Sequence, residues 1–81
     1  MTLRFTTNAN KRRIPHEAVW RVIVRTRPRP ITTDDGQEGL WYEGDDGEGL
    51  ELEVITVPLF GGDELVIHVM PTSHRHRKEG R

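Results

Sequence analysis

Basic and histidine side chains gather in two short stretches that could act on a phosphate group. One stretch precedes Ile14 and the other follows Ser73; their candidate members are Lys11, Arg12, Arg13, His74, Arg75, Arg77 and Lys78. Arg and Lys neutralise phosphate charge, and His transfers a proton near neutral pH. Cleavage of RNA through its own 2′-hydroxyl requires both kinds of group. The alternative is that the two stretches form only a solvated loop and a solvated tail.

Histidine could instead bind a metal ion. His74 and His76 are two residues apart, and His68 precedes them in the sequence. Metal sites usually have three or four ligands with oriented partners, and no carboxylate has a suitable spacing here. We therefore expect no metal. His68 is then either a proton-transfer group or a histidine at the edge of the core, satisfied by a hydrogen bond.

Two further motifs have structural explanations. The run from Asp45 to Glu48 superficially resembles a calcium loop but lacks the alternating acids and the distal Glu, so we expect a hairpin turn. Trp41 and Tyr42 are adjacent, so alternation along a strand places one in the core and leaves the other able to contact a ligand. No glycine-rich loop precedes a helix, so we expect no phosphate cradle and no cofactor.

Positive and negative charges occupy different parts of the sequence. Eleven of the 13 acids lie in residues 34–64, where Lys and Arg are absent. All 12 Lys and Arg lie outside that segment, where the only acids are Glu17 and Glu79. The pattern suggests a basic face for phosphate and an acidic face for a basic partner, unless folding pairs the charges internally.

Length and composition limit the possible architecture. The chain has 81 residues and no cysteine, so we expect a single thin core without disulfides or thiolate metal sites. No apolar run reaches the length of a signal peptide or a membrane span. The sequence therefore predicts one domain over residues 1–72 and a basic tail over residues 73–81, in the cytoplasm and without membrane contact.

Hydrophobic periodicity predicts the elements that would position the candidate residues. Alternating apolar residues predict a strand over residues 2–6, and residues 8–13 form either a loop or a short helix. Pro15 favours the first turn of a helix that must end before Pro28. The apolar stripe of this helix comprises Val19, Trp20, Val22 and Ile23.

The remaining segments predict strands. Residues 27–30 form a rigid connector, residues 31–33 begin a strand, and residues 40–43 form a short strand. Residues 50–60 are predicted to be the longest strand, and residues 65–70 a central strand with both faces covered, closed by Pro71. The fold class is α+β, with an N-terminal strand, one main amphipathic helix and a three- to four-stranded antiparallel sheet.

Five segments carry a family resemblance: Phe5–Ala9, Arg12–Ile23, Tyr42–Gly47, Leu50–Val54 and Leu65–Pro71. In this order, before a basic end, they resemble the small BrnT-like toxins of bacterial toxin–antitoxin systems, within the wider RelE-like group. The resemblance implies a helical segment on a small antiparallel sheet and a ribonuclease activity that arrests growth. It also implies a cognate antitoxin that covers the basic surface, and oligomers formed through that antitoxin.

The resemblance also assigns roles by position. It implies that the phosphate is held and polarised by Lys11, Arg12, Arg13, Arg75, Arg77 and Lys78, and that the proton is moved by His68 or His74. Relatives often have a histidine just after the first strand, where this sequence has Asn8. The implied substrate is cellular RNA, free or bound to the ribosome.

Two other functions fit the same residues. The chain could be a binding module without catalysis, such as a phage or regulatory protein, whose acidic hairpins occupy a basic partner surface. Asp45, Asp46 and Glu48 would then lie at the tip that makes the contact. It could also be an antitoxin-side or structural partner whose basic tail folds only on binding.

Overall fold

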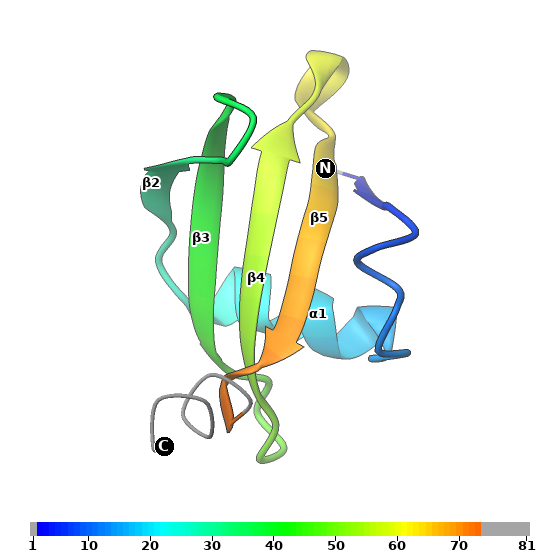
Figure 1. Cartoon of the computed structure of the whole chain (residues 1–81). Helices are drawn as coiled ribbons and strands as arrows, with labels where there is room; N and C mark the ends of the chain where they lie inside the picture. Colours follow the sequence, from blue (N-terminus) through cyan, green and yellow to red (C-terminus); the bar gives the residue numbers. More distant parts are fainter. Residues whose placement is uncertain (1, 74–81) are drawn as a thin grey trace, which may run out of the picture.

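The computed structural model of the chain describes residues 2–73, which form a five-stranded sheet with one α-helix packed across one face (Figure 1). In chain order the elements are β1 (Leu3–Phe5), α1 (His16–Arg25), β2 (Arg29–Thr32), β3 (Glu38–Asp45), β4 (Glu51–Pro58), the short 3-10 helix η1 (Phe60–Gly62) and β5 (Glu64–Pro71). The strand order is β1-β5-β4-β3-β2. Only β1 pairs in parallel, with β5; the other pairs are antiparallel. The predicted α+β architecture is confirmed.

Helix α1 begins and ends where the prolines indicate. Pro15 precedes its first residue, and the helix stops at Arg25, before Pro28. The Thr26 hydroxyl donates a hydrogen bond of 2.7 Å to the Val22 carbonyl and closes the last turn. Within residues 2–73, no helix has the length and apolarity needed to cross a membrane.

The buried side of α1 differs from the predicted stripe at one residue. The helix buries Ala18, Val19, Val22 and Ile23 against β3 and β4. Trp20 was expected in this stripe, but its side chain lies at the edge of the helix and is 40% exposed. Residues three or four apart lie on the same face of a helix, so these four side chains share one face. They already cover the part of α1 that meets the sheet.

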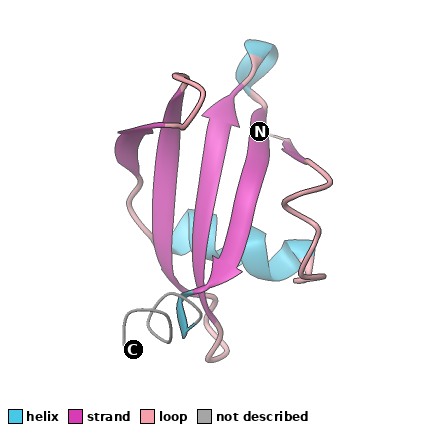
Figure 2. Cartoon of the chain, viewed as in Figure 1, coloured by secondary structure: helices cyan, strands magenta, loops and turns pink. Residues whose placement is uncertain are grey.

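The sheet has one covered and one open face. Tyr42, Val54 and Val69 are paired across β3, β4 and β5 and belong to the buried core beneath α1. The adjacent residues Ile55 on β4 and His68 on β5 are paired with each other and point to the opposite, open face, because side chains alternate along a strand. Figure 2 shows that α1 lies behind the sheet when the open face is viewed.

Several strand predictions need correction. β2 begins at Arg29, so Pro30 lies within a strand and not in a connector; the position is tolerated because β2 is at the edge of the sheet. β4 ends at Pro58 and is no longer than β3 or β5, because residues 60–62 turn with positive φ at both glycines.

The double coverage predicted for β5 is wrong. β5 does lie between two other strands, but α1 packs against β3 and β4, on one face only. A register shift between Ile55 and Thr56 adds one residue to β5, so its apolar run does not alternate strictly. Val66 and Val69 are therefore both buried, while Ile67 and His68 between them are half-buried.

Candidate functional site

The basic loop that follows β1 lies against β5. The backbone N–H of Thr6 donates to the Val66 carbonyl at 3.1 Å, and the Asn8 side-chain amide donates to the Ile67 carbonyl at 3.2 Å. Because β1 is parallel to β5, the loop continues in the direction in which β5 runs. The loop that carries the first basic cluster is thus attached to the strand that carries His68.

The loop has a defined conformation of its own. The Thr6 hydroxyl accepts a hydrogen bond from the backbone N–H of Ala9, which is buried, and backbone hydrogen bonds link Asn10 and Arg13 to earlier turns. Arg13 has φ of 56°, a left-handed conformation that is uncommon outside glycine. The predicted RNA-binding residues of this loop, Lys11, Arg12 and Arg13, are all exposed.

His68 lies on the open face of the sheet and is held by a carboxylate. Its Nε2 is 3.2 Å from Oε2 of Glu53 on β4. The side chain of Glu53 is only 10% exposed, whereas that of His68 is 30% exposed. The contact with Glu53 fixes the orientation of the imidazole. The arrangement satisfies the predicted hydrogen bond of an edge histidine and also leaves His68 accessible.

A groove of about 350 Å³ crosses the open face beside His68. Its lining comes from both edges of the sheet and from its middle: Asn8, Ile31, Thr32, Thr33, Asp34, Asp35, Ile55, Ile67 and His68. The loop after β1 supplies Asn8, and the β2–β3 turn supplies Asp34 and Asp35. One wall of the groove therefore adjoins the cationic loop and the other is anionic, so phosphate would be favoured near the loop.

The second basic cluster lies outside the described residues. His74, Arg75, Arg77 and Lys78, all predicted site residues, belong to residues 74–81. The described chain runs to Ser73, just after β5, and there the Thr72 hydroxyl donates to Glu51 at 3.4 Å.

His16 was not identified as a site residue from the sequence. Its ring stacks on Phe5 at the end of β1, with centroids 3.5 Å apart and planes 3° from parallel. Its Nε2 lies 2.6 Å from Oδ1 of Asn10. The first residue of α1 is thus tied to the same loop that carries the basic cluster. The only sequence signal was a histidine directly after Pro15, at a predicted helix start.

The acidic β3–β4 turn is a hairpin turn, as predicted. Oδ1 of Asp46 accepts hydrogen bonds from the backbone N–H groups of Glu48, at 2.8 Å, and Leu50, at 3.1 Å. These bonds, that of Glu48 foremost, hold the pKa of Asp46 below its usual value. Oδ1 of Asp45 accepts the N–H of Gly47 in the same way. Two of the three acids predicted to contact a partner, Asp45 and Asp46, therefore stabilise the turn, whereas Glu48 is exposed and lies 3.7 Å from Arg21.

The two aromatic residues of β3 separate as predicted. Tyr42 is in the core, and Trp41 is on the open face beneath the guanidinium of Arg29, 5.4 Å from the ring centroid. The phenol of Tyr42 is within hydrogen-bonding reach of Thr56 and Glu64. Burial first, and then the charge of Glu64, raise the pKa of Tyr42 above its ordinary value.

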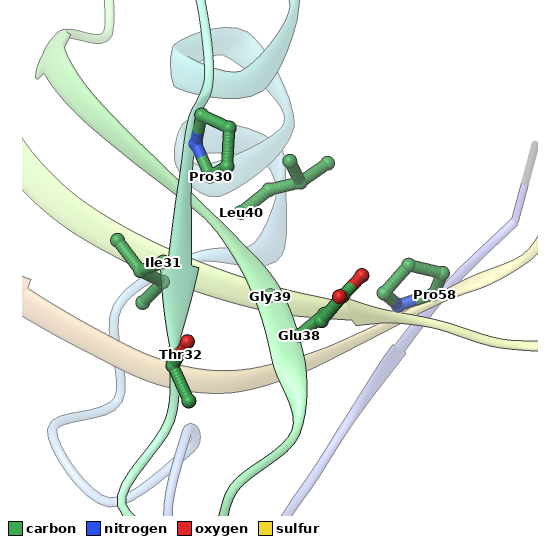
Figure 3. Close-up of a pocket in the computed structure, with 7 residues that line it drawn as sticks. All are labelled: Pro30, Ile31, Thr32, Glu38, Gly39, Leu40 and Pro58. Carbon is green, nitrogen blue, oxygen red and sulfur yellow. The ribbon is translucent and has the colours of Figure 1, made fainter.

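A second hollow, of about 480 Å³, lies between β2, β3 and the end of β4 (Figure 3). Figure 3 shows Pro30, Leu40 and Pro58 from the three strands around it, with Glu38 near Pro58. Its lining contains no histidine and no cation, so it lacks the groups that phosphate chemistry requires.

Neither a metal site nor a relative identifies the function. Among residues 2–73, no three His, Asp or Glu side chains are grouped as a metal ion would require. No family model, curated protein or solved structure matches the chain. The resemblance to BrnT-like toxins therefore stays a prediction, and function has to be argued from the geometry described above.

Proposed function

We propose that this chain is a ribonuclease toxin of a toxin–antitoxin system, which cleaves RNA without a metal ion. The observation that carries the proposal is the attachment of the basic loop to β5 through Asn8 and Ile67, at 3.2 Å. That contact places Asn8 next to the residue that precedes His68, and exposed Lys11 and Arg13 follow three and five residues later in the same loop. Cations for phosphate thus follow the edge strand β1, and an accessible imidazole lies on β5, the strand paired with β1.

In the proposed reaction, His68 accepts the proton of the 2′-hydroxyl while that oxygen attacks the adjacent phosphorus. The bond from phosphorus to the 5′-oxygen breaks, and the leaving oxygen takes a proton from a second acid, for which His74 is the candidate. The products are a 2′,3′-cyclic phosphate and a free 5′-hydroxyl. Glu53 would hold the imidazolium that forms on His68, since it already lies 3.2 Å from Nε2.

The cations have a separate role. Negative charge increases on the phosphate oxygens as the new bond forms, and side chains already in place stabilise that charge without reorganising. Lys11, Arg12 and Arg13 would do so from the loop, and Arg75, Arg77 and Lys78 from the tail. A cognate antitoxin that covers this basic edge would block both binding and cleavage, and cytoplasmic RNA would be the substrate.

The alternative of an acidic binding module is less well supported. It depends on acids at the tip of the β3–β4 hairpin that are free to meet a basic partner. Asp46 is buried and accepts two backbone hydrogen bonds, and Asp45 accepts another. Of the three hairpin acids only Glu48 is exposed, and Asp34 and Asp35 on the β2–β3 turn are the other exposed pair that a basic partner could meet.

Expression in bacteria tests the proposal. The full chain should arrest growth, and the double variant Lys11→Gln, Arg13→Gln should relieve arrest because two phosphate-binding cations are lost. The matched control is Arg25→Gln, Arg27→Gln, which removes the same charge from exposed residues at the end of α1 and beyond it. Circular dichroism verifies that each variant folds.

Three results would count against a toxin: normal growth with the full chain, arrest that persists in the loop variant, or relief by the control variant as well. Loss of the partner on neutralising Asp34 and Asp35, with growth unaffected throughout, would assign the acidic binding module. Arg75→Ala and Arg77→Ala extend the same test to the tail and should also relieve arrest.

A further inference from the structure

Trp20 is exposed on the helix face that borders the basic loop. It lies four residues after His16, so the two side chains are neighbours one turn apart on α1. Together with Leu3, Phe5 and Glu17 they line an open groove of about 480 Å³ between β1 and the first turns of the helix. Three of its five lining residues are aromatic, which is unusual for a part of the surface that a small domain leaves open.

The rings on one side of this groove are held in place. Phe5 and His16 are stacked, with planes 3° from parallel, and Asn10 binds Nε2 of His16. The side chains that bury α1 do not include Trp20, which is 40% exposed. Part of its indole surface is therefore available to a flat ligand.

We propose that this groove binds an unpaired base of single-stranded RNA, with Trp20 as the stacking platform and the Phe5–His16 pair as the opposite wall. The inference rests on the proposed function and adds to it the part of the substrate that is recognised. Every base presents an aromatic face, so stacking of this kind tolerates different sequences. The phosphate of a nucleotide whose base enters the groove would lie at the rim of the groove.

Charge next to the groove favours RNA over an apolar protein segment. Lys11, Arg12 and Arg13 directly follow Asn10, the residue bound to His16, so the groove lies beside the cationic part of the loop. The one acid in its lining, Glu17, is 3.8 Å from Arg21, which offsets its charge. An aromatic surface beside cations is the arrangement that binds single strands, with base and phosphate each given a partner.

The loop also connects this groove to the proposed catalytic edge. Asn8 binds the β5 backbone next to His68, and Asn10 binds His16 at the start of α1. The groove lies on the side of the sheet that α1 covers and His68 lies on the open face, so an RNA strand would reach both by passing over residues 11–13 around the β1 edge. The base groove would then determine which phosphate is positioned for cleavage.

Binding of a 2′-O-methylated single-stranded RNA, which cannot be cleaved through its 2′-oxygen, tests the inference. Trp20→Ala should weaken binding by about 10-fold, as expected for loss of one stacked base, while the dependence on salt concentration stays the same. Trp20→Phe should retain most of the affinity. Val24→Ala, a change at a more exposed apolar residue one turn further along α1, is the control and should bind like the unmodified chain.

A second RNA, identical in backbone but abasic, separates stacking from charge. The abasic RNA should bind the unmodified chain about 10-fold more weakly than the complete RNA does. Trp20→Ala should bind the abasic RNA with the same affinity as the unmodified chain does. Quenching of Trp20 fluorescence by the complete RNA, in a Trp41→Phe background that leaves Trp20 as the single tryptophan, should accompany binding.

The outcomes distinguish the two proposals. If the unmodified chain binds RNA in a salt-dependent way and Trp20→Ala binds equally well, the base groove is refuted and Trp20 belongs to a protein-docking surface. If the unmodified chain fails to bind RNA, or binds without dependence on salt, the proposed function itself fails and the groove fails with it.

Discussion

Tyr42 shows how one side chain can combine burial with a polar network. The residue is only 5% exposed, and its phenol lies beside the fully buried Thr56 and the carboxylate of Glu64. The Thr56 hydroxyl donates to Oε1 of Glu64 at 2.9 Å, so these groups satisfy one another under the helix. Ionising the phenol would place a second negative charge next to Glu64 in a poorly solvated position.

We therefore predict that Tyr42 keeps its proton to a higher pH in the folded chain than in the unfolded chain. A pKa raised by folding contributes stability that is complete below the ordinary value of 10.0 and is lost as pH rises through the raised value. Because the chain has one tyrosine, ultraviolet absorbance of the tyrosinate measures this directly. The same titration in concentrated urea supplies the reference. Native tyrosinate that forms at or below the pH seen in urea would contradict the account.

At this scale the sequence predicted some placements and missed others. Alternation along β3 correctly separated Tyr42 from Trp41, because a strand has only two sides. The exposure of Trp20 was missed. The positions of apolar residues along a helix do not show which of two adjacent residues, here Val19 and Trp20, lies at the edge of the buried face. His16 was missed because its stack on Phe5 joins residues that only the docking of β1 beside α1 brings together.

Packing of α1 on the sheet depends on a close approach at Gly44. A Cβ placed on Gly44 would meet Cγ2 of Thr26, the residue that ends the helix. Glycine is therefore required where the end of α1 crosses β3. The Thr26 hydroxyl meanwhile bonds to Val22, so its methyl group is fixed toward the strand.

We predict that Gly44→Ala lowers the free energy of unfolding by about 1–3 kcal/mol, the usual cost of overpacking. Thr26→Ser removes the obstructing methyl group and keeps the hydroxyl bond, so Gly44→Ala should cost much less in that background. Urea denaturation of the two single variants and the double variant measures the coupling. Additive losses would show that the contact between Gly44 and Thr26 does not control packing.

The elements themselves were largely predictable, and their ends were not. Pro15 and Pro28 delimit α1 because each restricts the local backbone. The alternating runs located β1, β4 and β5, but they predicted only the middle of β3 and the end of β2. β2 was predicted to begin at Ile31, but its pairing with β3 begins at Arg29. The strand therefore includes Pro30, which is tolerated because β2 is at the edge of the sheet. The register shift at Ile55 and Thr56, which decides which faces of β5 are buried, has no signal in the spacing of the residues.

For the whole molecule, the separation of charge along the sequence is kept in part, since Arg21 and Arg25 of α1 lie beside the acidic β3–β4 turn while the basic loop lies elsewhere. The basic loop after β1 adjoins β5 at one edge of the sheet, and the acidic turns belong to β2, β3 and β4. Within residues 2–73, the ion pairs that join the two sets include Arg4 to Asp63 at 3.8 Å and Arg21 to Glu48 at 3.7 Å, and both are long. Internal pairing therefore accounts for only part of the pattern, which supports a surface meant for an anionic ligand.

The candidate site was predictable in outline because its charged residues are clustered in the sequence. Chemistry of Lys, Arg and His identified the basic loop and His68, and pairing of the first strand with the last was needed to bring them together. The carboxylate partner Glu53 and the attachment through Asn8 could not be predicted, because both depend on the register between strands.

Incubation of the purified full chain with single-stranded RNA in the presence of a metal chelator tests the central claim most directly. The account predicts cleavage that persists with the chelator, leaves 2′,3′-cyclic phosphate ends, and falls at least tenfold in His68→Ala and in Lys11→Gln, Arg13→Gln, but not in Arg25→Gln, Arg27→Gln. RNA that stays intact, or cleavage that stops when metal is removed, would contradict it.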